Sequence, residues 1–371
     1  MSTNIQRPVI TYENVAVFQG DIPAHSEAAN SGASLEFIPS VQSLSFSFDI
    51  QRSNRAKIGS RDFIDRSNRV SPNVNLSIDI NEDFGQLFTN LLTGSSNIRN
   101  NFNVDRNFYA VIGDKRGVDM TGNSLTNVDM LSFGNCFLTD LSMSQSVNGL
   151  ITSQYSFIAS NVELQKSSSE GKFKVPSVDL TGDQSQNLSG FLDEMSTYYF
   201  TPIEDYMPYY STNVLISGNG EFKNFLIKSN SIQNFDLNFP INRKTIYNLG
   251  KKYPVQRKVL LPSLGTFSFS NIVSDFEIDN FKEFLETDIS YKLIISGQNT
   301  SLQPLHFEID DAKFNSFSQQ LSSENSIADL GFSFEINKFK AIDPIGTGLL
   351  KTQDNFFILQ ESLFNPDNIL L

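Results

Sequence analysis

The stretch VQSLSFSFDI, residues 41–50, decides the fold of this chain. From Leu44 to Ile50 every second residue is apolar and the residues between them are polar, a pattern typical of a β-strand with one face in a core. Residues 232–241, IQNFDLNFPI, repeat this pattern, with the apolar positions filled by Phe235, Leu237, Phe239 and Ile241. The chain therefore carries the same amphipathic strand twice.

The repeat extends beyond these strands. Residues 41–70 align without a gap on residues 232–261, at a shift of 191 residues (232 − 41). Six positions are identical in the two copies: Gln42 and Gln233, Phe48 and Phe239, Ile50 and Ile241, Arg52 and Arg243, Gly59 and Gly250, and Arg66 and Arg257. In both copies the strand leads into a polar, charged stretch that contains a glycine and ends at a shared arginine. An internal repeat of this kind predicts two tandem domains of one architecture.

Further elements follow in the same order in each copy. The alternating pattern predicts strands at residues 74–80, 108–113 and 154–164 in the first copy, and at 267–269, 291–297 and 331–337 in the second. Apolar residues at helical spacing after Asp83 and after Asp275 predict one α-helix per copy. We therefore predict a mainly β fold of two tandem β-sandwich or β-barrel domains, each with one flanking α-helix.

The domain boundary is predicted near residue 190. At 371 residues the chain is long enough for two domains, each with its own core. The first domain covers residues 1–190, with an exposed linker from about residue 166, and the second covers residues 191–371. The aromatic-rich segment 191–210 either packs between the domains or contacts a neighbouring subunit. The C-terminal extension, residues 341–371, has no counterpart after the first copy and is a candidate to dock on another chain.

The composition argues against several classes of protein. The 41 Asp and Glu outnumber the 28 Lys and Arg, and the net charge of −13 argues against a protein that grips nucleic acid by its phosphates. No run of about 18 apolar residues predicts a membrane span, and the N-terminus lacks the apolar core of a signal peptide. Cys136 is the single cysteine, so no intramolecular disulfide is possible. These features favour assembly in the cytoplasm.

Motifs for catalysis or metal binding are poorly represented. His25 and His306 lack the neighbours of a metal site or of a nucleophile's base, and a small buried thiol is a commoner fate for Cys136 than a catalytic dyad. Residues 275–286 imitate a calcium loop, but Asn280 stands where the sharp turn needs glycine. Dinucleotide, phosphate-loop and GxSxG motifs are absent. We predict no catalytic residue, no metal site and no cofactor; a hydrolase hidden in a sandwich fold is the minor alternative.

The repeat and the order of its elements resemble the tail tube proteins of tailed bacteriophages. The resemblance rests on residues 45–52 (SFSFDIQR), Gly59, Arg66, the strand at 74–80 and the following helix, and on their repetition at residues 235–243, Gly250 and Arg257. It implies a β-sandwich with one flanking helix, related to the tube protein of type VI secretion, whose subunits close into stacked rings around an inner β-barrel. A chain with two such domains resembles the duplicated variety, in which three chains form a ring of pseudo-sixfold symmetry.

The resemblance also implies a function and an interface. The chain would be a structural protein of the virion tail, assembled in the host cytoplasm, and its tube would conduct double-stranded DNA during ejection without binding it specifically. Its partners would be further copies of itself and other tail proteins, with no membrane. The long loop after the first strand would reach a neighbouring subunit or ring, which makes interface candidates of Arg52, Gly59, Arg66, Arg243, Gly250 and Arg257.

Physical arguments favour self-assembly, and one alternative stays open. Closing sheets into a ring removes their unpaired edges, and a head-to-tail contact that closes after three chains needs only one kind of interface. An acidic wall lets DNA slide, because like charges prevent adhesion, and the basic side chains of the loops are expected to meet acidic surface on a partner. The alternative is a tail-tip or adhesin-like binding protein of the virion, although such a module is expected to expose Trp, which this chain lacks.

Overall fold

The fold is built from β-strands. The computed structural model describes residues 15–20, 35–38, 41–49, 52–56, 58–59, 63–68, 73–81, 106–112, 129–166, 172–174, 185–187, 213–218, 226–227, 232–249, 254, 256–260, 264–272, 290–298, 304–320, 329–336 and 340–342. Every regular element in these ranges is a strand, which confirms the prediction of a mainly β fold. The two predicted helices, the linker after Lys166, the segment 191–210 and the extension beyond residue 342 lie outside the described residues.

The first half of the chain forms an antiparallel sheet around one long strand, β8. Its strands are β1 (Val15–Gly20), β2 (Leu35–Phe37), β3 (Val41–Asp49), β4 (Arg52–Ala56), β5 (Phe63–Asn68), β6 (Asn73–Asn81), β7 (Arg106–Ile112), β8 (Asp129–Ser146), β9 (Thr152–Ala159) and β10 (Asn161–Lys166). β3, β6, β9 and β8 lie side by side in that order, and β7, β1 and β2 continue from the other part of β8. β10 also pairs with β8, and β4 and β5 form a separate hairpin. Two short strands, β11 (Lys172–Lys174) and β12 (Ser185–Asn187), pair with each other.

The second half has the same order of strands. They are β13 (Asn213–Gly218), β14 (Leu226–Ile227), β15 (Ile232–Pro240), β16 (Arg243–Ile246), β17 (Gln256–Val259), β18 (Gly265–Ile272), β19 (Ser290–Gln298), β20 (Pro304–Gln320), β21 (Asp329–Ile336) and β22 (Lys340–Ile342). β15, β18, β21 and β20 lie side by side, and β19, β13 and β14 continue from the other part of β20. β22 pairs with β20, and β16 and β17 form a hairpin. Each strand from β1 to β10 thus has a counterpart, in order, from β13 to β22.

The register shifts of the two halves coincide as well. They lie between Val41 and Ser43 in β3–β6 and between Ile232 and Asn234 in β15–β18, and then between Leu138 and Asp140 in β8–β9 and between Phe314 and Ser316 in β20–β21. A bulge fixes the local twist and register of a ladder, so shared bulges align the halves residue by residue. By this alignment Leu141 of β8 corresponds to Phe317 of β20.

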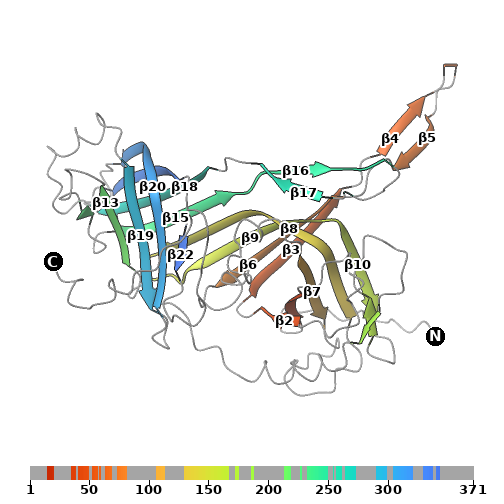
Figure 1. Ribbon diagram of the computed structural model, residues 1–371, viewed down its shortest axis with the longest axis horizontal. Helices are drawn as coiled ribbons and strands as arrows, with labels where there is room; N and C mark the ends of the chain where they lie inside the picture. The colour runs from red at the N-terminus through yellow and green to blue at the C-terminus, as the bar shows by residue number, and fades with distance from the viewer. Residues whose placement is uncertain are drawn as a thin grey trace, which may run out of the picture.

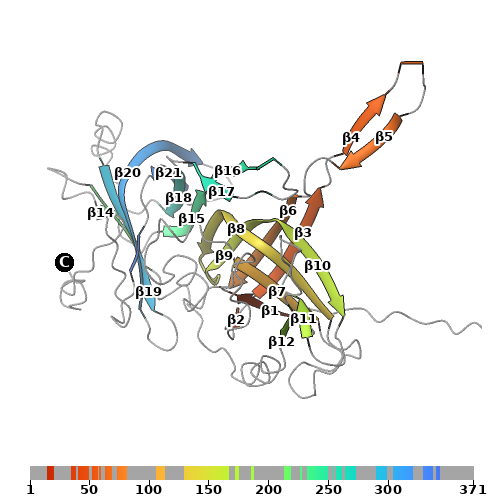
Figure 2. The same ribbon diagram turned by 45° about the vertical axis from the view of Figure 1, so that its right-hand side comes forward.

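One seam joins the two halves. β15 pairs antiparallel with residues 140–146 of β8, with Phe239 opposite Leu141 and Leu237 opposite Met143. The strand order across the seam is β3, β6, β9, β8, β15, β18, β21, β20, and these strands belong to one 16-stranded sheet. Figures 1 and 2 show β8 and β15 side by side where the first half passes into the second.

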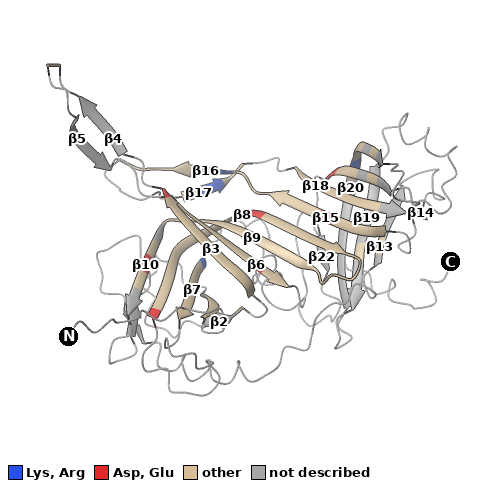
Figure 3. Ribbon diagram, turned by 180° about the vertical axis from the view of Figure 1, so that it is seen from behind, with Lys and Arg blue, Asp and Glu red and all other residues tan. Residues whose placement is uncertain are grey.

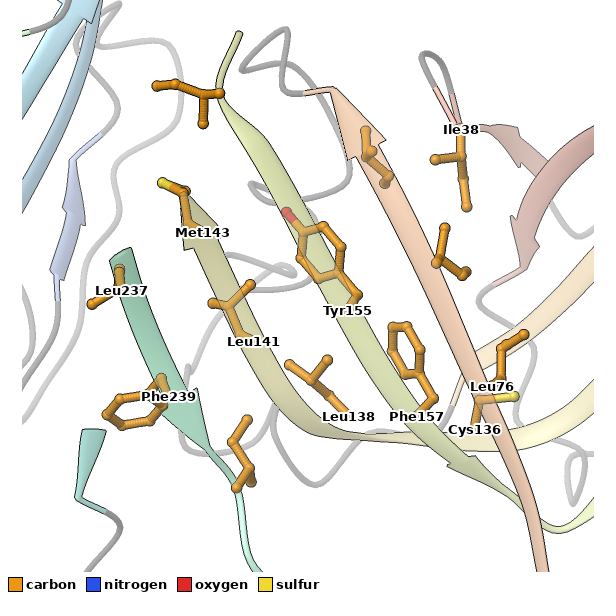
Figure 4. Close-up of a cluster of buried hydrophobic side chains, with 14 of the residues drawn as sticks. Ile38, Leu76, Cys136, Leu138, Leu141, Met143, Tyr155, Phe157, Leu237 and Phe239 are labelled. Atoms are coloured by element: carbon orange, nitrogen blue, oxygen red, sulfur yellow. The ribbon is translucent and has the colours of Figure 1, made fainter. Parts of the chain in front are cut away.

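The hydrophobic core spans this seam. Figure 4 shows Leu237 and Phe239 of β15 beside Leu141 and Met143 of β8, with Tyr155 of β9 next to them, and all five side chains are buried. Full burial of a Leu or Phe side chain stabilises the folded state by about 1.5–3 kcal/mol. The apolar side chains of β15 therefore stabilise the fold by packing against β8, across the boundary between the two halves.

The sequence analysis predicted eight strands, which correspond to nine of the 22 described strands, and it missed the two longest, β8 and β20. The predicted strands at 41–50, 74–80, 108–113, 232–241, 267–269, 291–297 and 331–337 are confirmed as β3, β6, β7, β15, β18, β19 and β21. The predicted strand at 154–164 is interrupted at Ser160, where the chain passes from β9 to β10. β8 escaped prediction because residues 132–136 are all buried, and a strand covered on both faces shows no alternation.

Candidate assembly surface

Among the described strands, β3 forms an edge of the sheet. In the described part of the chain its residues 43–49 pair with β6 alone, on one side. Phe46 contacts Phe133 edge-on, with 5.3 Å between the ring centroids, yet 43% of Phe46 is exposed, and Phe48 is 58% exposed. A strand with an unpaired edge and exposed aromatic side chains is a template for pairing with another chain.

The counterpart strand β15 shows what covers such residues. Leu237 and Phe239 occupy the positions of Phe46 and Phe48, but they are only 1% and 8% exposed. β3 and β15 each pair with the strand that follows their hairpin, so this neighbour does not account for the difference. The difference is the second neighbour of β15, residues 140–146 of β8.

The described strands have a second edge at the opposite end of the strand order. Residues 316–320 of β20 pair with β21 on one side, and no strand in the described ranges pairs with their other side. The corresponding part of β8 carries β15 at this place. The strand order therefore starts with β3, the counterpart of β15, and ends with β20, the counterpart of β8. Within the chain, β15 and β8 pair with each other.

The hairpin β16–β17 is anchored on the first half of the chain by Arg257. This side chain is 1% exposed, and its Nη1 and Nη2 atoms donate hydrogen bonds to the main-chain carbonyls of Ile158 at 2.7 Å and Ala159 at 3.3 Å. The guanidinium carbon lies 5.9 Å from the centroid of the Phe137 ring, within the range of a cation–π contact. Among the described residues Nε of Arg257 has no hydrogen-bond partner.

Arg243 is the second anchor of this hairpin. Its Nε donates to the carbonyl of Leu138 at 2.7 Å, and its Nη1 donates to the carbonyl of Arg257 at 3.1 Å. Its guanidinium carbon lies 5.3 Å from the centroid of the Phe137 ring. Burial, with a smaller contribution from the charge of Arg257, lowers the pKa of Arg243 to about 10, and burial also lowers the pKa of Arg257. A pKa of about 10 leaves Arg243 charged at neutral pH, so main-chain carbonyls and one ring face hold this charge.

The equivalent hairpin β4–β5 has a different place in the molecule. Figures 1 and 2 show it projecting away from the sheet, whereas the contacts of Arg243 and Arg257 hold β16–β17 against β8 and β9. Arg52 opens β4, and Arg66 lies in β5 opposite Asn54. Gly59 lies in the turn with φ +87°, a conformation that glycine adopts without strain. Gly250 lies outside the described residues.

Both hairpins carry an exposed apolar residue near the tip. Ile58 in the first and Leu249 in the second are fully exposed, and they occupy corresponding positions, 191 residues apart. A single exposed apolar residue on a protein surface is ordinary. Two of them at corresponding positions on equivalent hairpins make the tips candidate contacts with another molecule.

The structure divides the six predicted interface residues. Arg243 and Arg257 come together and contact carbonyls of their own chain. The expectation that each basic side chain of the loops meets acidic surface on a partner is wrong for Arg257, because its own chain buries it. An interface role of the remaining candidates stays a prediction. Sequence reasoning missed Phe46, Phe48 and the two tip residues, although the apolar alternation of β3 marked the first two as members of a core face.

No group of three or more His, Cys, Asp or Glu side chains within the described ranges is arranged to hold a metal ion. Cys136 is a buried free thiol, and burial raises the pKa of the neighbouring Tyr109 far above its ordinary value. The described part of the chain also contains no helix long and apolar enough to cross a membrane. Figure 3 shows the basic residues of β17 and scattered acidic positions on the strands.

Comparisons with known proteins identify no family. No protein-family model matches the sequence, and no curated protein matches it significantly. Among the solved structures with a match is a chain of the "cryo-EM structure of the anti-feeding prophage (AFP) baseplate, 6-fold symmetrised", with 12% sequence identity and a TM-score of 0.27. The match covers 36% of this chain and 92% of that one. A similarity of this size assigns neither a function nor an assembly.

Proposed function

We propose that this chain is a self-assembling structural protein that forms the tail tube of a bacteriophage. The observation that carries the proposal is the pair of edges that no described strand covers: β3 exposes Phe46 and Phe48 beside one of them, and residues 316–320 of β20 form the other at the opposite end of the strand order. Soluble monomers avoid such edges, because they promote association. Pairing of one end of the strand order with the other end in a second copy would cover both edges.

The proposal includes two domains that arose by duplication, residues 1–190 and residues 191–371. It is supported by the one-to-one order of strands β1–β10 and β13–β22 and by the coincident register shifts. The contact between copies joins unlike edges, so it is head-to-tail and generates a ring when the rotation closes. Three chains with two domains each would form a ring of pseudo-sixfold symmetry.

Stacking of rings would turn them into a tube. The projecting hairpin β4–β5, with Ile58 exposed near its tip, is suited to reach a subunit outside its own ring. The net charge of −13 would allow double-stranded DNA to move through the tube without adhering, since binding to phosphates needs clustered cations. Assembly in the host cytoplasm and contacts with other tail proteins belong to the same proposal.

Electron microscopy of the purified chain tests this function. Rings and hollow tubes are expected, together with a mass several times that of the 41.6 kDa chain in light scattering. A monodisperse monomer under all conditions would contradict the proposal and would favour the alternative, a tail-tip or adhesin-like binding protein.

A variant of the β3 edge makes the test specific. Phe46→Lys with Phe48→Lys places two cations on the open edge and should abolish rings, while the monomer keeps its circular dichroism spectrum, because both side chains already face solvent in large part. Val147→Lys is the matched control: Val147 is 43% exposed, as Phe46 is, but it lies in the turn after β8. The control variant should assemble normally.

A further inference from the structure

The internal seam between β8 and β15 supplies a template for a contact between copies. The two halves share their strand order and their register shifts, so the edge of β8 that binds β15 corresponds to residues 316–320 of β20. The strand that corresponds to β15 is β3, whose edge is open among the described residues. We infer that β3 of a second copy of this chain pairs antiparallel with residues 316–320 of β20, in the register of the internal seam. This inference rests on the proposed self-assembly and specifies its contact.

The internal seam determines the register of the proposed one. Within the chain, Phe239 lies opposite Leu141, Asn238 opposite Ser142, and Leu237 opposite Met143. The corresponding pairs between copies are Phe48 with Phe317, Ser47 with Ser318, and Phe46 with Gln319. The proposed pairing places a strand beside Phe46 and Phe48, as β8 lies beside Leu237 and Phe239. A slip by one residue would turn both Phe side chains to the opposite face.

Two main-chain hydrogen bonds at the internal seam show which pairs of opposite residues are hydrogen-bonded pairs of the antiparallel ladder. The N–H of Ile241 donates to the carbonyl of Thr139 at 2.7 Å, and the N–H of Val147 donates to the carbonyl of Gln233 at 2.9 Å. Bonded and non-bonded pairs alternate along an antiparallel ladder, so Asn238 and Ser142 form a non-bonded pair. Ser47 and Ser318 therefore also form a non-bonded pair, with their Cα atoms about 4.5 Å apart.

The arginine anchor of β16–β17 has a counterpart in the proposed seam. Arg66 corresponds to Arg257, and the carbonyls of Glu335 and Ile336 correspond to those that Arg257 binds. Arg66 of one copy would thus reach the end of β21 in the next copy. The projecting hairpin β4–β5 would then contact a neighbouring copy in the way that β16–β17 contacts β8 and β9 of its own chain.

The partner is a second copy because both edges belong to the same chain. One chain offers β3 at one end of the strand order and residues 316–320 of β20 at the other, and the internal seam shows that strands of these two types fit together. The bulge of β20 between Phe314 and Ser316 corresponds to the bulge of β8 between Leu138 and Asp140, so residues 316–320 of β20 follow their bulge as residues 140–144 of β8 follow theirs.

Disulfide cross-linking tests the register. The variant Ser47→Cys with Ser318→Cys places two thiols in the proposed non-bonded pair, at a Cα separation of about 4.5 Å that a disulfide can span. The native Cys136 is buried and stays in place. Mild oxidation should give covalent multimers on a non-reducing gel, and reduction should return them to one chain. Each single variant, oxidised alone, is expected to stay monomeric on the gel.

A register-shifted variant is the matched control. In Ser47→Cys with Gln319→Cys the second thiol lies on the opposite face of the strand, so its multimers should be at least about tenfold fewer. Equal cross-linking in both variants would overturn the register. Rings in the microscope without cross-links in the first variant would overturn the inference and leave the proposed function standing, whereas the absence of both rings and multimers would contradict both.

Discussion

β3 and β15 are the same strand in two environments, and they differ in what covers them. Both alternate apolar and polar residues, both precede a hairpin, and both pair with the strand that follows that hairpin. Phe46 and Phe48 are nevertheless exposed where Leu237 and Phe239 are buried. Within the described part of the chain, β3 lacks the second neighbour that β15 has in β8, and the same pattern forms part of the core where β8 lies beside it.

The two hairpins extend the comparison. β16–β17 is held by Arg243 and Arg257 on carbonyls of the first half, and β4–β5, which has arginines at the same positions, projects from the sheet. The chain thus contains one complete seam, in which β15 and the hairpin β16–β17 contact β8 and β9, and it repeats β15 and this hairpin as β3 and β4–β5 without such a contact among the described residues. Substitutions at corresponding positions should affect the two differently.

The largest expected effect is loss of folding stability at the internal seam. Leu237→Ala should lower the free energy of unfolding by about 2–5 kcal/mol, since it removes a fully buried side chain and leaves a cavity. Phe46→Ala, at the corresponding position, should cost the unassembled chain much less, because 43% of Phe46 is already exposed. Urea unfolding of unassembled protein measures both, and equal losses would show that the two positions are equally covered.

The arginine anchor comes next. Arg257→Met should lower the free energy of unfolding by about 1–3 kcal/mol, because two hydrogen bonds from a charged group are lost while its desolvation is relieved. Arg66→Met should leave the stability of the unassembled chain unchanged and weaken assembly. Thermal unfolding and light scattering separate the two effects, and destabilisation of the unassembled chain by Arg66→Met would contradict the comparison.

Reversal of both Arg243 and Arg257 to Glu is unsuitable as a test of assembly. It would place carboxylates against the carbonyls of Leu138, Ile158 and Ala159, where no donor replaces the guanidinium groups. We expect the variant to unfold, so a loss of tubes would not report on an interface.

The hairpin tips should affect stacking alone. Ile58→Ser and Leu249→Ser replace fully exposed side chains, so each should change the free energy of unfolding by less than about 0.5 kcal/mol. If the tips contact a neighbouring ring, tubes of these variants should be shorter on electron micrographs, with rings intact. Tubes of normal length in both single variants and in the double variant would exclude the tips as contacts.

The smallest expected effect is a pH dependence at the internal seam. Burial raises the pKa of Asp140 and of Asp236, which lie on β8 and β15. A raised folded-state pKa means that the folded chain binds more protons than the unfolded one, so stability falls as the pH rises from the ordinary Asp pKa through the raised value. Asp236→Asn should therefore stabilise the chain at neutral pH, by less than about 0.5 kcal/mol because the group is largely solvated.

Asp236→Asn should flatten the dependence of unfolding on pH, because it removes the carboxyl whose pKa is raised in the folded chain. A steeper dependence in the Asp236 variant would show that the sign is wrong. The proposed seam between copies has Ser45 and Ser316 at the positions of Asp236 and Asp140, so it should lack this dependence.

Local pattern was enough to predict the strands with one buried face. The alternation in β3, β6, β15 and β18, and the shift of 191 residues between copies, can be read directly because a half-buried strand imprints a period of two on the sequence. The first part of β8 left no such imprint, because it is buried on both faces over residues 132–136.

The sequence pattern could not predict which strands lie side by side. Phe48 and Phe239 are identical residues at repeated positions, and nothing in their flanking sequence says that one is 58% exposed and the other 8%. Arg257 gave the same signal as Arg66, yet carbonyls more than ninety residues away in the chain bury it. Sequence periodicity reports which face of a strand is apolar, whereas pairing of a strand edge depends on main-chain groups that every residue carries. Only the tertiary arrangement decides which edge is filled and which stays open.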